Sequence, residues 1–536
     1  MSMNRSLGSR DYDAIVIGAG HNGLTAAAIL AKSGLNVLVI ERRQILGGAA
    51  SAEEAFAGCQ VSVGALDAGL FLPQLIAELG LERYGLRWIE SPALTTVFAS
   101  SGKPLTLWRD VQRTAREIAQ YSTEDARRYP EFVAQVYQLS AVLAEMMTLT
   151  PPALPVVHLS DLAGWLRPAL QARRLGEKAF MAMLRILPMS VADYLDEWFE
   201  TPALKSALGS TSVIGQMQGP RAPGTAFLLL YHAIHAAQGE TRSSRFVQGG
   251  PQALIQALAR SASEHGAELC TGLAVVKVLI NDDRAIGVEL ENGECLYARA
   301  MLSSLDARRT LFDLVGAPNL EVRMVREVKN IRLSGSLARL NLLLSDLPQF
   351  NIQEAERERI SGHIVICPDL DYLERAYDDA KYGQFSQKPF LDVVIPTITD
   401  PSLAPAERHL MNINIQYTPR WLKSGDWNDQ RQALLEVALD TLAAYAPDLR
   451  RCILDYQLLT PLDLERELGL SEGDIYQGQM GLDQLLFMRP IPGFPQYRMP
   501  LDGLYLCGAG AHPGGGLTGA PGYNAARQVL RILSAR

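Results

Sequence analysis

The amino-acid sequence predicts an α/β fold in which one domain is assembled from separated segments and a second, α+β domain caps it. Three patterns support this prediction. Residues 13–41 read as strand, glycine turn, helix and strand, and residues 503–530 read as strand, glycine-rich loop and helix. Between them, residues 246–306 read as a glycine turn, an amphipathic helix, a strand and a hairpin with Asn292-Gly293 as its turn.

The amino-terminal pattern begins with an apolar, β-branched run from Asp13 to Ile17. The cluster Gly18-Ala19-Gly20-His21-Asn22-Gly23 follows, and then an alanine-rich helix that ends at Gly34. A second strand, NVLVI, runs to Glu41. A glycine turn between strand and helix, with an acid at the end of the next strand, is typical of a dinucleotide-binding βαβ unit.

Each glycine of this turn has a separate physical role. Gly18 permits the tight turn, Gly20 lets a pyrophosphate approach the backbone, and Gly23 lets the helix pack on the strand. Glu41 follows Gly23 by 18 residues, where a carboxylate accepts hydrogen bonds from ribose hydroxyls. We therefore predict that these four residues bind a dinucleotide.

The residues after Glu41 distinguish FAD from NAD. The run E-x-R-x-x-x-G-G resembles the FAD signature of glutathione-reductase-like flavoproteins, in the branch that holds amine oxidases and phytoene desaturases. The resemblance implies a pyrophosphate contact for Gly47 and Gly48 and an adenosine contact for Arg43. Ala49 stands where that family usually has an arginine at the phosphates.

The carboxyl-terminal pattern contains a strand from Leu504 to Cys507, a loop to Gly516 with five glycines in nine residues, and a helix from Leu517 onward. Such a glycine density indicates close approach of the backbone to a flat or anionic group. The N-terminus of the following helix offers N–H groups to a partly negative acceptor, such as the N1–C2=O2 edge of a flavin.

This stretch, HPGGGLTGAPGYNAA, resembles the carboxyl-terminal signature of the phytoene-desaturase family. It looks most like the subgroup of pyridine nucleotide-disulphide oxidoreductase domain-containing protein 2 relatives and desaturase-type carotenoid ketolases. The resemblance implies that Gly508 and Gly510 lie near the ribityl chain or pyrophosphate. It places the isoalloxazine over Leu517, Thr518, Gly519 and Ala520. Amine oxidases have an acid where this chain has Gly510.

By the same resemblance, the fold is a discontinuous FAD-binding Rossmann domain of the glutathione-reductase type with an α+β substrate domain, the cap. Val275 would touch the adenine, although a core valine is the alternative. The predicted FAD-binding domain comprises residues 9–75, 244–310 and 490–536. The cap comprises residues 76–243, which read as mainly helical, and residues 311–489, which mix strands and helices.

Composition excludes several classes of protein. The 50 basic and 58 acidic residues give a net charge of −8, which argues against nucleic acid as a partner. The six cysteines show neither a CxxC pair nor a disulfide framework, and the spacing suits a reducing compartment. The first ten residues lack the apolar centre of a secretory signal, so we expect a cytoplasmic protein.

The sequence identifies no catalytic residue and predicts no metal site. His232 and His235 are three positions apart, but no acid near them completes a ligand set. We expect His512 to make a hydrogen bond within its loop rather than to transfer a proton. The oligomeric state is not predicted.

The leading functional hypothesis is an FAD-dependent oxidoreductase acting on a largely apolar, carotenoid-like substrate. A flavin amine oxidase and a non-catalytic FAD-binding scaffold remain alternatives. A disulphide reductase is disfavoured because no redox cysteine pair exists. The apolar stretch 139–159, with Val156 and Val157, either contacts a membrane surface peripherally or folds into the cap core.

Overall fold

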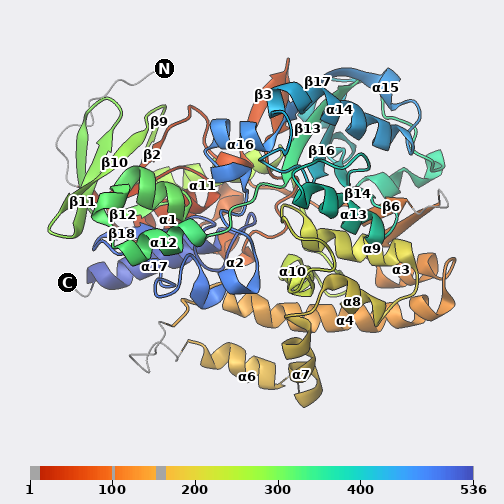
Figure 1. Ribbon diagram of the computed structural model, residues 1–536, viewed down its shortest axis with the longest axis horizontal. Coiled ribbons are helices and arrows are strands. Elements are labelled where there is room, and N and C mark those ends of the chain that lie inside the picture. The colour runs from red at the N-terminus through yellow and green to blue at the C-terminus, as the bar shows by residue number, and fades with distance from the viewer. Residues whose placement is uncertain (1–11, 99–102, 153–163, 175, 535–536) are drawn as a thin grey trace.

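The computed structural model describes residues 12–98, 103–152, 164–174 and 176–534, and contains two seven-stranded sheets. Figure 1 shows the sheets in two lobes, one around β10, β11 and β12 and the other around β13, β14 and β16. Long helix α4 (Thr123–Met146) runs below the second lobe. The predicted α/β class is therefore confirmed.

The first sheet has the strand order β10-β11-β12-β1-β2-β9. Strand β18 also pairs with β12, next to residues 301–303, whereas β11 pairs with residues 295–297. Strands β18, β12, β1, β2 and β9 run parallel, whereas the hairpin β10-β11 is antiparallel. The strands therefore come from three distant parts of the chain. They are β1 (Tyr12–Ile17), β2 (Val37–Glu41), β9 (Glu268–Thr271), β10 (Val275–Asn281), β11 (Arg284–Leu290), β12 (Cys295–Ser303) and β18 (Leu504–Leu506).

Three helices pack together beside this sheet. Helix α1 (His21–Lys32) contacts both α11 (Pro251–Glu264) and α17 (Ala520–Ser534). Ten of the twelve residues of α1 are buried, and five of these are small alanine or glycine residues, so its neighbours can approach closely. The two glycine motifs at opposite ends of the chain thus lie side by side.

The second sheet has the strand order β17-β13-β16-β15-β14-β6-β7. One face carries apolar residues such as Leu340 and Ile413, which join an apolar core with helix α14 (Trp427–Ala443). The opposite face carries buried polar residues, including Asn341 and Asn414. The strands are β6 (Ala93–Phe98), β7 (Pro104–Trp108), β13 (Leu337–Leu344), β14 (His363–Ile366), β15 (Leu391–Val394), β16 (His409–Gln416) and β17 (Ile453–Leu459).

The segment 76–243 is less helical than the sequence predicted, because it supplies β6 and β7 to the second sheet. All six residues of β6 are buried, so the strand shows no alternation of polar and apolar residues. Its pairing partner β14 is more than 260 residues away and could not be inferred from local pattern. The same segment also contains the short helices α8 (Val191–Asp196) and α9 (Pro202–Gly209).

The remaining elements connect or cover these sheets. Two small antiparallel pairs join β3 to β4 and β5 to β8. The elements are β3 (Ala52–Phe56), β4 (Cys59–Ser62), β5 (Trp88–Ile89), β8 (Phe246–Val247), α2 (Pro73–Glu78), α3 (Val111–Ile118), α6 (Leu166–Arg174), α7 (Glu177–Ile186), α10 (Thr225–His232), α12 (Val322–Asn330), α13 (Leu370–Lys381), α15 (Leu449–Cys452) and α16 (Pro461–Leu468).

Within the described ranges, no helix combines the length and apolar character needed to cross a bilayer. Most of the apolar loop proposed to contact a membrane, with Val156 and Val157, lies outside the described residues. The division of the chain into an FAD-binding domain and a cap stays a prediction, although each predicted part contributes strands to one of the two sheets.

Candidate functional site

The glycine turn after β1 leaves room for a ligand at one position only. Gly18 has φ +90°, and a Cβ at Gly23 would come within 2.1 Å of the Gly18 carbonyl oxygen. A Cβ at Gly20, by contrast, would meet no protein atom within 4 Å. Gly18 and Gly23 therefore shape the turn, whereas Gly20 faces open space.

The N-terminus of α1 opens into that space. Gly20 caps the helix without a side-chain hydrogen bond, and the first turn contains no acidic residue. The backbone N–H groups of the first turn are consequently available to an anion, and the helix dipole favours negative charge there. These features fit the pyrophosphate of a dinucleotide.

Glu41 links the turn to the next strand. Its carboxylate accepts hydrogen bonds from the backbone N–H of Ala19 at 2.8 Å and of Arg43 at 3.0 Å, and it is only 7% exposed. Each carboxylate oxygen retains a free lone pair after these bonds, so it can also accept a ribose hydroxyl. Glu41 thus stabilises the turn itself as well as lining the cleft.

The second glycine pair lies opposite the first turn. Gly47 donates its N–H to the Ala19 carbonyl at 2.9 Å, and both Gly47 and Gly48 have positive φ, +123° and +56°. Arg43 forms an ion pair with Glu53, which directs its charge partly away from the cleft.

These residues surround a cleft of about 380 Å³. Eight residues predicted from the sequence line it: Gly18, Gly20, Glu41, Arg43, Gly47, Gly48, Ala49 and Val275. Gly23 lies behind the wall, against Gly18.

The carboxyl-terminal loop reaches the same cleft. Gln477 connects two segments there, because it accepts a hydrogen bond from the Gly510 N–H at 2.9 Å and donates one to the Ser304 carbonyl at 3.0 Å. A Cβ at Gly508 would come within 2.3 Å of that same carbonyl oxygen. Gly508 therefore packs against Ser304 at the end of β12, Gly510 packs against Gln477, and Ala509 between them lines the cleft.

The sequence predicted four residues under the flavin ring, Leu517, Thr518, Gly519 and Ala520, and only Leu517 lines one of the two cavities. Leu517 lines a second pocket, whereas Thr518 and Ala520 are fully buried at the start of α17. Gly519 has φ +74° and packs against Phe71. The contact of Thr518, Gly519 and Ala520 with a cofactor stays a prediction.

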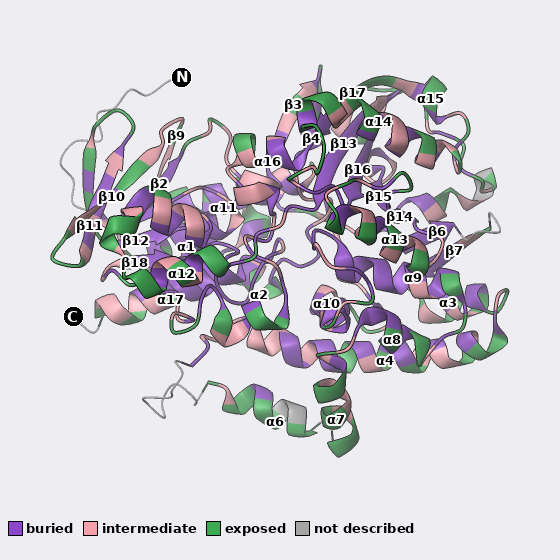
Figure 2. Ribbon diagram, in the orientation of Figure 1, coloured by how far each residue is buried: buried purple, intermediate pink, exposed green. Residues whose placement is uncertain are grey.

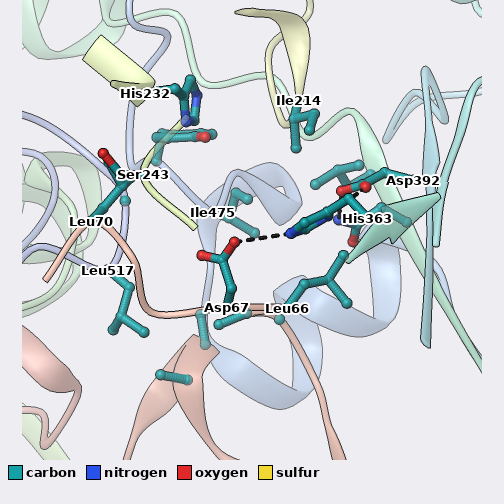
Figure 3. A pocket seen from close by; sticks show the side chains of 18 of the residues that line it. Leu66, Asp67, Leu70, Ile214, His232, Ser243, His363, Asp392, Ile475 and Leu517 are labelled. Carbon is teal, nitrogen blue, oxygen red and sulfur yellow. Dashed lines mark hydrogen bonds and ion pairs between the residues drawn. The ribbon is translucent and has the colours of Figure 1, made fainter. Parts of the chain in front are cut away.

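The second pocket, of about 130 Å³, lies between the polar face of the second sheet and the loops of the first lobe. It shares His21, Ala49 and Ile475 with the cleft, so the two cavities adjoin each other. Figure 3 shows the apolar side chains of Leu70 and Leu517 on one side of this pocket. The opposite wall is charged.

Three residues form the charged wall (Figure 3): His363 and Asp392 are buried, and Asp67 is partly buried. Asp67, in the loop before α2, accepts from Nε2 of His363 at 2.9 Å, and Nδ1 of His363 lies 2.7 Å from Asp392 Oδ1. Arg242 lies 3.8 Å from Asp67. Asn414 donates to the other oxygen of Asp392 at 3.4 Å. We call Asp67, His363 and Asp392 the carboxylate–histidine cluster.

Electrostatics keeps this cluster charged. Burial and Arg242 act to lower the pKa of His363, but the two carboxylates outweigh them and raise it above its usual value. Burial opposes ionisation of Asp392, yet His363 lowers the pKa of that carboxyl to about 2. The pKa of Asp67 is also lowered, against burial, by His363 and Arg242. Both carboxylates are therefore ionised and are poor proton acceptors.

The other histidines near the cavities are neutral. Burial lowers the pKa of His232, which lines the second pocket, to about 4. The pKa of His21 is lowered to about 4 for the same reason, and its Nε2 lies 3.1 Å from the Gly516 carbonyl oxygen. His512 contacts the Met146 carbonyl oxygen at the end of α4 at 3.1 Å, so its hydrogen bond reaches outside the loop in which the sequence predicted it. Among the described residues, no group of histidine, cysteine or acidic side chains is arranged to hold a metal ion.

The sequence did not predict the carboxylate–histidine cluster. Asp392 did carry a signal, because an acid within the apolar strand FLDVVIP must find a buried partner. Nothing in the sequence indicates that this partner is His363 or that Asp67 completes the cluster.

Comparisons with known proteins agree with this geometry. Residues 16–66 match the NAD(P)-binding Rossmann-like domain family. The rat protein named pyridine nucleotide-disulfide oxidoreductase domain-containing protein 2 is 36% identical over 546 residues, which cover 98% of this chain and 94% of that protein. The chain belongs to that protein's family.

The wider family is also supported. The lycopene-forming phytoene desaturase of Pantoea ananas is 25% identical, over 95% of this chain and 96% of that protein. An oxidoreductase from Methanosarcina mazei shares the fold, with a TM-score of 0.60 at 17% identity over 97% of this chain and 99% of that one. The resemblance to phytoene-desaturase-like FAD oxidoreductases is therefore confirmed, and the protein is an oxidoreductase.

Proposed function

We propose that the cleft binds FAD, with the pyrophosphate at the N-terminus of α1 and the adenosine toward Glu41 and Val275. The observation that supports this orientation is that the cleft and the second pocket share His21, Ala49 and Ile475. A dinucleotide extended along the cleft would therefore present its other end to the pocket. That end would carry the flavin, beside Gly516 and Leu517.

Bound FAD supplies an acceptor for a hydride or its equivalent at flavin N5. The residues of this chain would bind and orient the two reactants. In the second pocket, Leu70 and Leu517 offer apolar surface to a substrate. Asp67 and His363 offer a fixed charge on the opposite side.

We propose a substrate with a largely apolar body, as the name of the phytoene desaturase relative suggests, oxidised by dehydrogenation. The apolar half of the pocket lining supports this part of the proposal. A hydrocarbon alone would leave the carboxylate–histidine cluster without a role in binding. A hydrogen-bond donor on the substrate would match Asp67, whose Oδ1 accepts the Gly69 N–H at 3.2 Å and has no second donor among the described residues.

The second candidate function, amine oxidation, rests on the same carboxylate. Asp67 stays ionised beside the pocket, and a negative charge there suits a protonated amine. Against it, Arg242 offsets part of that charge, and Gly510 stands where amine oxidases have an acid. A third candidate, a non-catalytic scaffold, predicts a flavin that no small substrate reduces.

An anaerobic experiment separates the three candidates. The purified protein is examined for a flavin spectrum and then mixed without oxygen with phytoene, with benzylamine or with NADPH. Bleaching by phytoene supports dehydrogenation, whereas bleaching by benzylamine supports amine oxidation. Absence of flavin from a folded protein that also fails to bind added FAD would contradict the proposal.

The variant Asp67→Asn tests whether the substrate is a protonated amine or a hydrocarbon. The amide retains the shape of the side chain but removes its charge. Reduction by an amine should then slow by at least about tenfold, because a charged hydrogen bond is lost. Reduction by a hydrocarbon should change little.

A further inference from the structure

Helices α6 and α7 form a small unit at the edge of the molecule. Figure 1 shows both helices below α4, on the side away from the two sheets. They contact α4 and each other. Figure 2 shows that most of their described residues are exposed, in contrast to the buried helices of the first lobe.

The exposed side chains include an unusual number of large apolar residues. Leu166 and Leu170 on α6 are 62% and 51% exposed. They are four positions apart, as are Phe180 and Leu184 on α7, so each pair shares one helix face. Met181 adds a further side chain that is 57% exposed. We call these five residues the apolar stripe of α6 and α7.

Basic residues surround the apolar stripe. Residues 164–187 contain five basic side chains and one acid, Glu177, a local charge of 5 − 1 = +4 in a chain whose net charge is −8. Arg167 and Arg185 face the carboxylates of Glu145 and Glu197 at 3.5 and 2.5 Å. The other three, Arg173, Arg174 and Lys178, form no ion pair within the described part of the chain.

We propose that this surface docks the protein peripherally on a membrane that contains anionic lipids. Exposed leucine, phenylalanine and methionine side chains flanked by arginine and lysine are the composition of helices that lie in the lipid interface. The basic residues complement anionic headgroups while the apolar stripe enters the acyl boundary. A second copy of the chain is a poor partner, because it would bring Arg173, Arg174 and Lys178 against the same three basic residues.

Vesicle sedimentation tests this proposal with the full-length protein. We expect it to sediment with vesicles of phosphatidylcholine and phosphatidylglycerol, and not with phosphatidylcholine alone. High salt should weaken the association. Replacing Arg173, Arg174 and Lys178 by glutamine should lower the partition coefficient about a hundredfold, given about 1 kcal/mol for each basic residue near an anionic surface.

The apolar stripe is tested separately with Met181→Ser and Leu184→Ser, which should also reduce vesicle binding. Matched controls are Val322→Ser and Trp421→Ser, which remove equally exposed apolar side chains elsewhere. Arg326→Gln and Lys329→Gln on α12 control for the loss of basic charge, with two charges removed against three. None of these residues lines the cleft or the second pocket, so flavin content and thermal stability should stay unchanged in every variant.

Two outcomes would overturn the proposal. One is the absence of sedimentation with anionic vesicles, and the other is binding that the α12 controls reduce as much as the α6 and α7 variants do. A dimer in light scattering that Met181→Ser and Leu184→Ser dissociate would assign the surface to a second copy instead. All these readouts are independent of the flavin, so they stand whether or not the proposed function is correct.

Discussion

The Nε2 atom of His363 lies 2.9 Å from Oδ2 of Asp67, although 296 positions separate the two residues in the sequence. Asp67 belongs to the loop before α2, which follows the small β3-β4 pair, whereas His363 begins β14 in the second sheet. Their bond therefore ties the two lobes together beside the second pocket. Asp392 extends it on the other side of the imidazole ring.

His363→Gln should destabilise the protein substantially. The substitution removes the imidazolium and leaves Asp67 and Asp392 as buried carboxylates without their main cation. Breaking a buried ion pair in this way costs about 3–5 kcal/mol of unfolding free energy, measured by urea denaturation. The matched control is His265→Gln at the C-cap of α11, a histidine that lines neither the cleft nor the second pocket. Equal stability of the two variants would show that the cluster contributes no net free energy.

The same variant tests the pH dependence of the cluster. Because the pKa of His363 is raised in the fold, its stabilisation is fully present below the unfolded value of 6.5 and is lost as pH rises through the folded pKa. The unfolding free energy of the wild type should therefore decline with pH above 6.5 more steeply than that of His363→Gln. Parallel pH curves would contradict a protonated His363.

Gly20→Val should abolish FAD binding without unfolding the protein. A Cβ at Gly20 meets no protein atom within 4 Å, so valine would project into the cleft that the pyrophosphate needs. We expect a colourless apoprotein of nearly unchanged thermal stability. Gly23→Ala is the contrasting variant, because its Cβ would come within 2.1 Å of the Gly18 carbonyl and should destabilise the fold itself. A yellow, stoichiometrically flavinated Gly20→Val protein would refute the placement of the cofactor.

Glu41→Ala should have two separable effects. Loss of charge-assisted hydrogen bonds to the ribose should raise the FAD dissociation constant about tenfold to a hundredfold. The apoprotein should also lose about 1–3 kcal/mol of unfolding free energy, because the N–H groups of Ala19 and Arg43 lose their acceptor. Glu264→Gln, an exposed acid on α11, controls for loss of charge. An unchanged dissociation constant would assign Glu41 to the turn alone.

The parts of the fold that the sequence predicted are those in which local chemistry is sufficient. The turn at Gly18 and Gly20 combines a strand, a helix and an acid within 30 residues, so spacing alone identifies it. The buried strand β6 shows no alternation, and one of its two neighbours in the sheet, β14, is distant in sequence. The carboxylate–histidine cluster joins β14 and β15 to Asp67, which is almost 300 positions from His363, and one sequence does not reveal that contact.

Acidification should loosen the carboxyl-terminal loop through His512. Burial lowers the pKa of this histidine to about 4, and Arg489 also disfavours its protonation. A base whose folded pKa is depressed favours the unfolded state once it is protonated, so stability is lost as pH falls from 6.5 toward 4.

The loss from this one group is about 2–4 kcal/mol, at about 1.4 kcal/mol for each pKa unit. Urea denaturation across that pH range measures it. His512→Gln keeps a donor for the Met146 carbonyl oxygen but cannot be protonated, so its unfolding free energy should fall less steeply than that of the wild type. His409→Gln serves as the control, because that histidine is only partly buried and lies on β16, away from the loop. If the unfolding free energy of both variants falls with pH as steeply as that of the wild type, His512 has no part in the acid response. Other buried groups, such as His21 and His232, would then account for the loss of stability.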